Sequence, residues 1–175
     1  MDGQKNIPAR ICRILLKEIP YLNAVIVEFP ETTVAVVEHH GPVEQEHQSA
    51  RRLIDWKLEN KLLDPARHRN YGVHYTDPTS VSSDQHHVDF CLSVDDFVGE
   101  NDYDVVNKVI PACRCARARD VGSRYNNKAA AFLREEWFPQ SGEKLGEFPM
   151  FFHYVNVGPN VEEDEMITDV YLPLR

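Results

Sequence analysis

The chain has 175 residues, of which 42% are hydrophobic and 27% charged, and its formal net charge is −9 at pH 7. This composition excludes a disordered or fibrous chain and is typical of one globular domain, or of two small repeats that share a core. The acidic balance argues against an extended phosphate-binding surface, so we expect no direct nucleic-acid binding.

The start of the chain is polar, and the short apolar run at residues 14–16 cannot span a bilayer. We therefore expect no membrane partner. The four cysteines include no CxxC pair, which favours reduced thiols and a cytoplasmic location.

The first half of the sequence predicts a strand, a helix and two further strands. Residues 32–40 are rich in β-branched side chains and end at Gly41-Pro42, which predicts a strand. A helix is expected next and should end before Asp64-Pro65. Its apolar stripe is expected to comprise Val43, His47, Ala50, Ile54, Leu58 and Leu62. Residues 70–76 and 87–94 predict the other two strands.

The same order recurs in the second half. Residues 109–119 predict a strand that ends before Gly122, and Ser123 is the expected N-cap of a helix. The apolar stripe of this helix is expected to comprise Tyr125, Ala129, Phe132, Leu133 and Trp137. Pro139 and Gly142 should end the helix, and residues 149–156 and 167–174 predict two more strands.

Landmark residues of the two halves match at a nearly constant spacing. At an offset of 81 residues the sequence aligns Gly41 with Gly122, Ala50 with Ala131, Trp56 with Trp137 and Pro78 with Pro159. One residue of slippage brings Asp89 onto Asp169. This agreement predicts a duplication, with pseudo-repeats at about 25–97 and 105–175 after an N-terminal extension of residues 1–24. The expected fold class is α+β, with duplicated strand–helix–strand–strand units that form a curved antiparallel sheet with both helices on one face.

Side-chain alternation in the last strand of each half separates an apolar face from a face with a carboxylate. Val88, Phe90, Leu92 and Val94 share one face of their strand, and Asp89 lies on the other. In the last strand of the chain the apolar face comprises Val170, Leu172 and Leu174. Asp169 and Tyr171 lie opposite. We expect the apolar faces to pack under the helices. The carboxylate faces are then left either as a solvated surface or as a ligand site.

Aromatic residues near these carboxylates are the next candidates for a site. Tyr75 shares a strand face with Tyr71, and Tyr154 shares a face with Phe152. Alternation alone does not decide which of these faces is open. Trp137 ends a helical stripe, so it is either a core residue or a pocket wall. Aromatic rings around a carboxylate would suit an apolar or cationic small molecule.

The sequence gives little support for metal binding or catalysis. The histidine pairs His39-His40 and His86-His87 are adjacent along predicted strands, so the two neighbours point to opposite faces and do not easily hold one ion. No nucleophile elbow, phosphate-binding glycine loop or HExxH motif is present. We therefore expect no metal site, no cofactor and no catalytic residue. The basic residues around Arg114, Arg117 and Arg119 are expected to balance local acids.

Several strings together resemble the GyrI-like family, which includes the AraC-type effector-binding domains. They are residues 36–42 (VVEHHGP), the stretch from Gly72 to Pro78, residues 137–142 (WFPQSG) and residues 169–173 (DVYLP). The resemblance extends from about Val25 to Leu174. It implies a concave sheet of two repeated units, with a central cleft that binds small, often hydrophobic or cationic molecules.

The family's central acid is usually a glutamate in the last strand, two residues before a tyrosine. Here Asp169 takes that place before Tyr171, with the same charge and a shorter reach. The ligand-binding residues implied by the resemblance and by strand position are Asp169, Tyr171, Trp137, Tyr75 and Tyr154.

The resemblance implies a stand-alone small-molecule sensor. A protein partner through which the sensor acts is compatible with it. About 24 residues precede the first family-like strand, too few for the DNA-reading module of an AraC-type regulator. The alternative is a hydrolase that uses the cleft acid, because some relatives hydrolyse strained molecules. A haem carrier of similar duplicated architecture is a third hypothesis, but no axial histidine can be identified.

Overall fold

The computed structural model describes residues 22–77 and 79–175, so residues 1–21 of the expected N-terminal extension, with Cys12, lie outside it, as does Pro78. The described residues form one eight-stranded antiparallel sheet in the order β1-β6-β8-β7-β3-β4-β2-β5. The strands are β1 (Ala24–Phe29), β2 (Thr32–His40), β3 (Asn70–His74), β4 (His87–Ser93), β5 (Val106–Ile110), β6 (Cys113–Val121), β7 (Phe151–Tyr154) and β8 (Ile167–Pro173). The helices are α1 (Glu46–Glu59), α2 (Lys128–Ala131) and α3 (Phe138–Ser141).

The sheet has a symmetric strand order. Strands β7 and β3 pair at its centre, and outward from them β8 corresponds to β4, β6 to β2 and β1 to β5. Each half therefore contributes two strands, a helix and two further strands in the same spatial arrangement, one strand more than the unit expected from the sequence. The α+β class and the antiparallel sheet expected from the sequence are confirmed.

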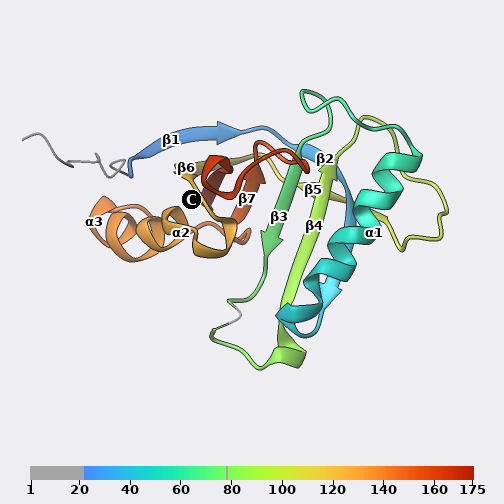
Figure 1. Ribbon diagram of the computed structural model, residues 1–175. Coiled ribbons are helices and arrows are strands. Elements are labelled where there is room, and N and C mark those ends of the chain that lie inside the picture. The colour runs from blue at the N-terminus through green and yellow to red at the C-terminus, as the bar shows by residue number, and fades with distance from the viewer. Residues whose placement is uncertain (1–21, 78) are drawn as a thin grey trace, which may run out of the picture.

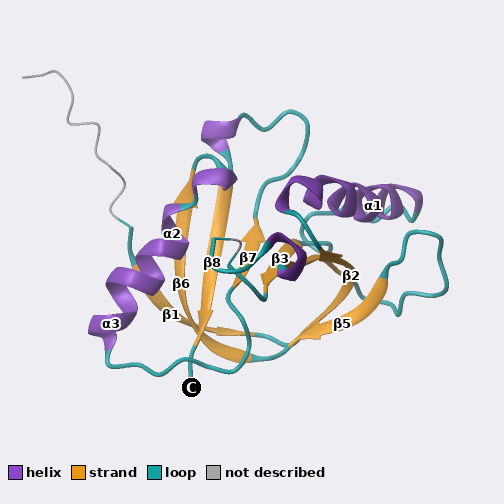
Figure 2. Ribbon diagram, turned by 90° about the horizontal axis from the view of Figure 1, so that it is seen from below, coloured by secondary structure: helices purple, strands orange, loops and turns teal. Residues whose placement is uncertain are grey.

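Both helices cover the same face of the sheet, and each covers one half (Figures 1 and 2). Under α1, Leu53 and Trp56 pack on Val37 and Leu92. Under the second helix, the core comprises Ala116, Ala118, Ala129, Leu133, Val170, Leu172 and Leu174. The apolar faces predicted for β4 and β8 thus lie where alternation placed them.

The stripe predicted for the first helix was wrong. Val43, Ile54 and Leu58 are exposed, whereas Leu53 and Trp56 are buried against the sheet. The sequence carries two competing apolar stripes on this helix. The stripe that contains Trp56 faces the sheet, since the indole buries the larger apolar area.

The strand predicted at residues 109–119 is two strands, β5 and β6, which join at Pro111 and Ala112. Proline cannot donate a backbone hydrogen bond to a ladder, so it favours a break at this point. Strand β5 pairs with β2 of the first half, and β6 pairs with β1 and β8.

The second helix is continuous but irregular. Asn127, not Ser123, is the N-cap of α2, because its side chain accepts a hydrogen bond from the backbone of Ala130. Residues Phe132–Trp137 form a π-helical segment before α3, and Gly142 ends the helix with a φ of 70°. A π-helical turn absorbs one extra residue. This accounts for the alignment of Leu53 with Leu133 at an offset of 80, although Trp56 aligns with Trp137 at 81.

The face of the sheet without helices has a core of its own. Phe29 contacts Tyr71, Phe151 and Tyr171 with ring centroids 4.8–5.9 Å apart. The curvature of the sheet thus brings together aromatic side chains from β1, β3, β7 and β8. None of the described helices is long and apolar enough to cross a membrane.

Candidate functional site

Asp169 in β8 is buried on the face without helices and forms an ion pair with Arg119 in β6. The two residues lie directly opposite each other in the antiparallel ladder. The Nε and one terminal nitrogen of Arg119 donate to the two carboxylate oxygens over 2.7 and 2.8 Å. Only 4% of the Asp169 side chain is exposed, against 52% of Arg119. A buried carboxylate needs a cation or several donors, and here a half-exposed guanidinium fills that role.

His153 and Tyr71 continue the same row of side chains across the sheet. His153 lies opposite Asp169, and Tyr71 lies opposite His153 with ring centroids 5.0 Å apart. Burial lowers the pKa of His153 to about 4, even though the Asp169 charge acts in the other direction. The imidazole next to Asp169 is therefore neutral at pH 7.

Tyr171 is two residues from Asp169 and points to the same face. Its ring stacks on Phe151 with centroids 4.9 Å apart and an interplanar angle of 2°. Burial raises the pKa of both Tyr171 and Tyr71, while hydrogen bonds with Arg117 and Arg69 act in the opposite direction. The two phenols are therefore neutral, and their hydroxyl groups are polar atoms among aromatic rings.

A cavity of about 400 Å³ opens beside these phenols, under the β1–β2 turn. Tyr71 and Tyr171 line it together with Arg69, Arg117 and Phe29. This volume is within the range of small-molecule sites. The lining combines three aromatic residues with several charged ones, which include Glu28, Glu31 and Asp95.

Tyr75 lies on the same face but in the first half, next to Asp89. Its hydroxyl donates to Asp89 over 3.0 Å, and its ring stacks on His87 with centroids 4.1 Å apart. Lys108 donates to the same carboxylate oxygen of Asp89 over 2.7 Å. Burial and the Asp89 charge raise the pKa of Tyr75 to about 12. Tyr75 therefore belongs to the Asp89 cluster and not to the surroundings of Asp169.

Trp137 and Tyr154 lie on the opposite, helix-covered face. Trp137 is half-buried and packs against the core under the second helix. Tyr154 shares its strand face with Phe152, and burial raises the pKa of its phenol. A Cβ added at Gly72 would lie 2.7 Å from the Tyr154 hydroxyl, so glycine leaves the room that this ring occupies. The five candidate residues thus divide between two faces of the sheet.

Sequence reasoning missed the partners of Asp169. Arg119 was expected to balance an acid, and both it and Arg114 do so, the latter with Glu143. Which acid each arginine meets depends on strand register, which the sequence pattern does not reveal. His153 and Tyr71 were recognised as strand residues, but their common face with Asp169 follows only from the pairing of β7 with β3 and β8.

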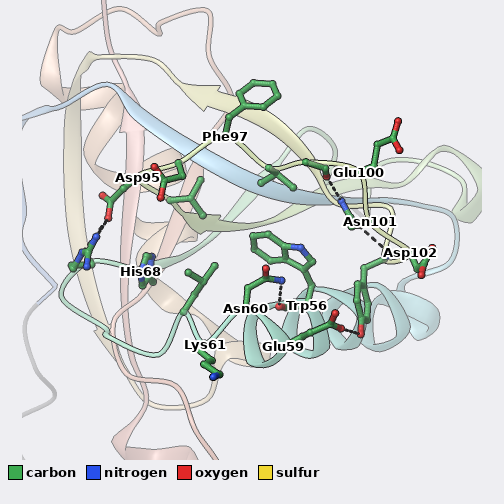
Figure 3. A pocket seen from close by; sticks show the side chains of 17 residues that line it. Trp56, Glu59, Asn60, Lys61, His68, Asp95, Phe97, Glu100, Asn101 and Asp102 are labelled. Atoms are coloured by element: carbon green, nitrogen blue, oxygen red, sulfur yellow. Dashed lines mark hydrogen bonds and ion pairs between the residues drawn. The ribbon is translucent and has the colours of Figure 1, made fainter.

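A second pocket lies between the end of α1 and the loop at residues 94–103 (Figure 3). Its volume is about 790 Å³, and Trp56 and Phe97 lie on opposite sides of it. Its polar groups are largely paired within the pocket: Asn60 donates to the Trp56 carbonyl, Tyr103 to Glu59 and Arg67 to Asp95.

The two histidine pairs separate across the sheet. The inner members, His39 and His86, contact Ser49 and Glu46 of α1. The outer members, His40 and His87, lie opposite each other on β2 and β4 and stack with centroids 4.1 Å apart. Together with Glu38, His40 and His87 form a group that could hold a metal ion.

Known proteins with similar sequences and folds agree with this architecture. The probable transcriptional regulator YgiV of Escherichia coli K12 is 32% identical over 154 residues, which are 87% of this chain and 96% of that protein. The C-terminal domain of EcmrR superposes with a TM-score of 0.69 at 18% identity, over 89% of this chain and 98% of that one. EcmrR in its DNA complex gives a TM-score of 0.70, also at 18% identity, over 91% of this chain. The matched part spans only 59% of the EcmrR chain.

The family match covers the whole sheet and both helices. The GyrI-like small molecule binding domain matches residues 23–175, and the effector-domain fold is shared with EcmrR. The chain therefore belongs to the family of GyrI-like small molecule binding domains, related to the effector domains of transcription regulators.

Proposed function

We propose that the chain senses a lipophilic aromatic molecule, and that a cationic group on this ligand takes the place of Arg119 at Asp169. The observation that carries this proposal is the ion pair itself. Asp169 is buried and must keep a cation, whereas its present partner is half exposed and can move into water. A ligand cation could therefore replace the guanidinium without leaving a bare buried charge.

The surroundings of Asp169 support an aromatic ligand. The rings of Tyr171 and His153 lie on the same face as the carboxylate, and both are neutral at pH 7. Rings of this kind attract cations through their faces and also supply apolar contact area. The cavity of about 400 Å³ is lined by Tyr171, two residues from Asp169, and would take the uncharged part of the ligand; Asp169 itself does not line it.

The hydrolase alternative has less support. A carboxylate that activates water needs an oxygen free to accept its proton. Both oxygens of Asp169 accept hydrogen bonds from Arg119.

We also propose that the domain acts in the cytoplasm through a protein partner and does not contact DNA itself. The net charge of −9 opposes phosphate binding, and the described helices pack on the sheet instead of forming a pair that could enter a groove. Fluorescence anisotropy with labelled duplex DNA at low salt tests this point. Tight binding that weakens steeply with salt would show that the domain contacts DNA.

The ligand proposal is tested with two probes of nearly equal shape and opposite charge, tetraphenylphosphonium and tetraphenylborate. Calorimetric titration should show that the cation binds more tightly. We expect Asp169→Asn to weaken cation binding by about tenfold or more, since charged hydrogen bonds contribute about 1.5–3 kcal/mol. Arg119→Gln should strengthen it, because the competing guanidinium is gone.

Asp89→Asn is the matched control. It removes the equivalent carboxylate of the first half and should leave cation binding at Asp169 unchanged. Equal affinity for both probes, or the same affinity in Asp169→Asn as in the unmodified chain, would contradict the proposal.

A further inference from the structure

Three side chains on the face without helices converge at the outer end of β2 and β4. Glu38 and His40 alternate along β2, so they point to the same face. His87 of β4 lies directly opposite His40 in the ladder. Alternation along one strand and register across two strands thus place one carboxylate and two imidazoles together.

The geometry of this Glu38–His40–His87 cluster is close to that of a metal site. One ligand atom from each residue lies within 4.8 Å of the other two. A tetrahedral ion with bonds of about 2.1 Å holds its ligand atoms about 3.4 Å apart. The rings of His40 and His87 are stacked and imidazole lone pairs lie in the ring plane, so the His40 ring has to turn out of this stack to share an ion with His87. Glu38 and His40 are exposed, which leaves their side chains room to turn.

Neighbouring residues orient His87 as metal sites usually orient their ligands. The Nε2 of His87 is 3.2 Å from a carboxylate oxygen of Asp89, which leaves Nδ1 for an ion. Histidine ligands generally donate their second ring nitrogen to a carboxylate in this way. The ring of Tyr75 stacks on His87 with centroids 4.1 Å apart and further limits the orientation of the imidazole.

The charge balance also suits a divalent cation. Glu38 and Asp89 lie opposite each other, an arrangement of like charges that costs energy unless a cation is near. Lys108 contacts both carboxylates and neutralises one of the two charges. One negative charge therefore remains beside the two imidazoles.

The second half of the molecule supplies an internal comparison. At the positions equivalent to Glu38, His40 and His87 it carries Arg119, Val121 and Ile167. Val121 and Ile167 are paired in the ladder as His40 and His87 are. Equivalent backbone positions thus hold three metal-ligating groups in one half and none in the other.

We propose that Glu38, His40 and His87 form a binding site for a divalent transition metal ion such as Zn²⁺. Two imidazoles and one carboxylate are ligands that suit zinc and its neighbours in the first transition row. The ion would link β2 to β4, and at least one coordination position would stay open to water or a ligand. This site is separate from Asp169 and does not depend on the proposed small-molecule function.

The test uses the full chain in metal-free buffer, titrated with Zn²⁺ by calorimetry and with Co²⁺ by visible absorption. We expect one ion per chain and a Co²⁺ spectrum typical of nitrogen and oxygen ligands. His40→Ala, His87→Ala and Glu38→Gln should each weaken Zn²⁺ binding by at least about tenfold, the scale on which even outer ligand-orienting residues act. Zn²⁺ at a hundredfold excess over Kd should raise the melting temperature by about 5 °C.

Two variants serve as controls. His47 is an exposed histidine on α1, and His47→Ala should bind Zn²⁺ like the unmodified chain. Asp169→Asn should also keep Zn²⁺ binding, so failure of the ligand proposal and failure of the metal proposal can be told apart. Circular dichroism checks that the exposed-site variants His40→Ala and Glu38→Gln keep the fold.

The proposal is overturned if Zn²⁺ affinity is the same in His40→Ala and His87→Ala as in the unmodified chain. Thiolate charge-transfer bands with Co²⁺ that disappear in Cys113→Ser would also overturn it. Those bands would place the ion at Cys113 and Cys115, whose sulfurs lie 3.4 Å apart.

Discussion

Asp89 and Asp169 occupy equivalent positions in the two halves of the sheet, yet they are neutralised in different ways. Asp169 has one partner, Arg119, which lies directly opposite on β6 and is half exposed. Asp89 lies opposite another acid, Glu38, and its cation reaches it from β5 as Lys108. It also accepts a hydrogen bond from Tyr75.

Equivalent backbone positions thus hold a carboxylate with one cationic partner in one half and a carboxylate with several partners in the other. A carboxylate held by a single, half-exposed cation can exchange that cation for another. A carboxylate held by several side chains instead fixes its neighbours, here Tyr75 and His87. We therefore propose cation exchange for the Asp169 half and metal binding for the Asp89 half.

The largest effect on stability is expected when the Asp89 carboxylate is removed. Asp89→Ala should lower the free energy of unfolding by about 4 kcal/mol, because Tyr75, His87 and Lys108 all lose their hydrogen bonds with this carboxylate. Asp169→Ala should cost about 2 kcal/mol, since Arg119 can turn into water. Urea unfolding of both variants measures the difference. Equal losses would mean that the two halves hold their carboxylates equally firmly.

The next effect concerns the centre of the sheet, where His74 of the first half takes the place of Tyr154 in the second. Burial lowers the pKa of His74 from 6.5 to about 4. Its Nε2 has no hydrogen-bond partner among the described residues. The unfolded chain therefore takes up a proton between these pH values that the folded chain does not.

Stability at this position should consequently be full above about pH 6.5 and fall by about 3 kcal/mol as the pH drops to 4. Urea unfolding across this range measures the loss, and His74→Phe should remove most of this part of it. A His74→Phe variant with the same pH dependence as the unmodified chain would show that His74 is not buried as a neutral imidazole.

A smaller effect tests the asymmetry between Gly72 and Phe152, which lie opposite each other in the central strands. Gly72→Ala places a Cβ 2.7 Å from the Tyr154 hydroxyl and should destabilise the fold by about 2 kcal/mol through overpacking. Thermal unfolding measures the change. Adding Tyr154→Phe removes the hydroxyl and should restore part of the loss; no restoration would place the strain elsewhere.

The smallest expected effect on stability comes from making one half resemble the other. Glu38→Arg places a cation opposite Asp89, as Arg119 lies opposite Asp169. We expect a change of less than about 1 kcal/mol, because Glu38 is exposed, together with loss of Zn²⁺ binding. Thermal unfolding with and without Zn²⁺ measures both. Retained Zn²⁺ stabilisation would exclude Glu38 as a ligand.

The strands were predictable because alternation and turn residues mark them locally. Residues 32–40 were predicted as β2 and match its bounds, and the predictions for β4 and β8 differ from the structure by one residue. The helix stripe and the long strand at 109–119 were wrong. Tertiary packing decided which of the two apolar stripes of the first helix faces the sheet. Pro111 favoured two strands over one at residues 109–119.

The site was less predictable, because it depends on register. Position in the last strand indicated Asp169 and Tyr171, and both lie on the face without helices. The pairing of Arg119 with Asp169 and of His40 with His87 requires knowledge of which strands are neighbours. The duplication boundaries at about 25–97 and 105–175 stay a prediction.

The most direct test of the ligand site is a crystal structure of the chain with tetraphenylphosphonium bound. We predict that the cation contacts Tyr171 and lies at the Asp169 carboxylate, with the Arg119 side chain turned into solvent. Binding in the pocket between α1 and residues 94–103, with the Arg119–Asp169 ion pair intact, would contradict the proposed exchange of cations.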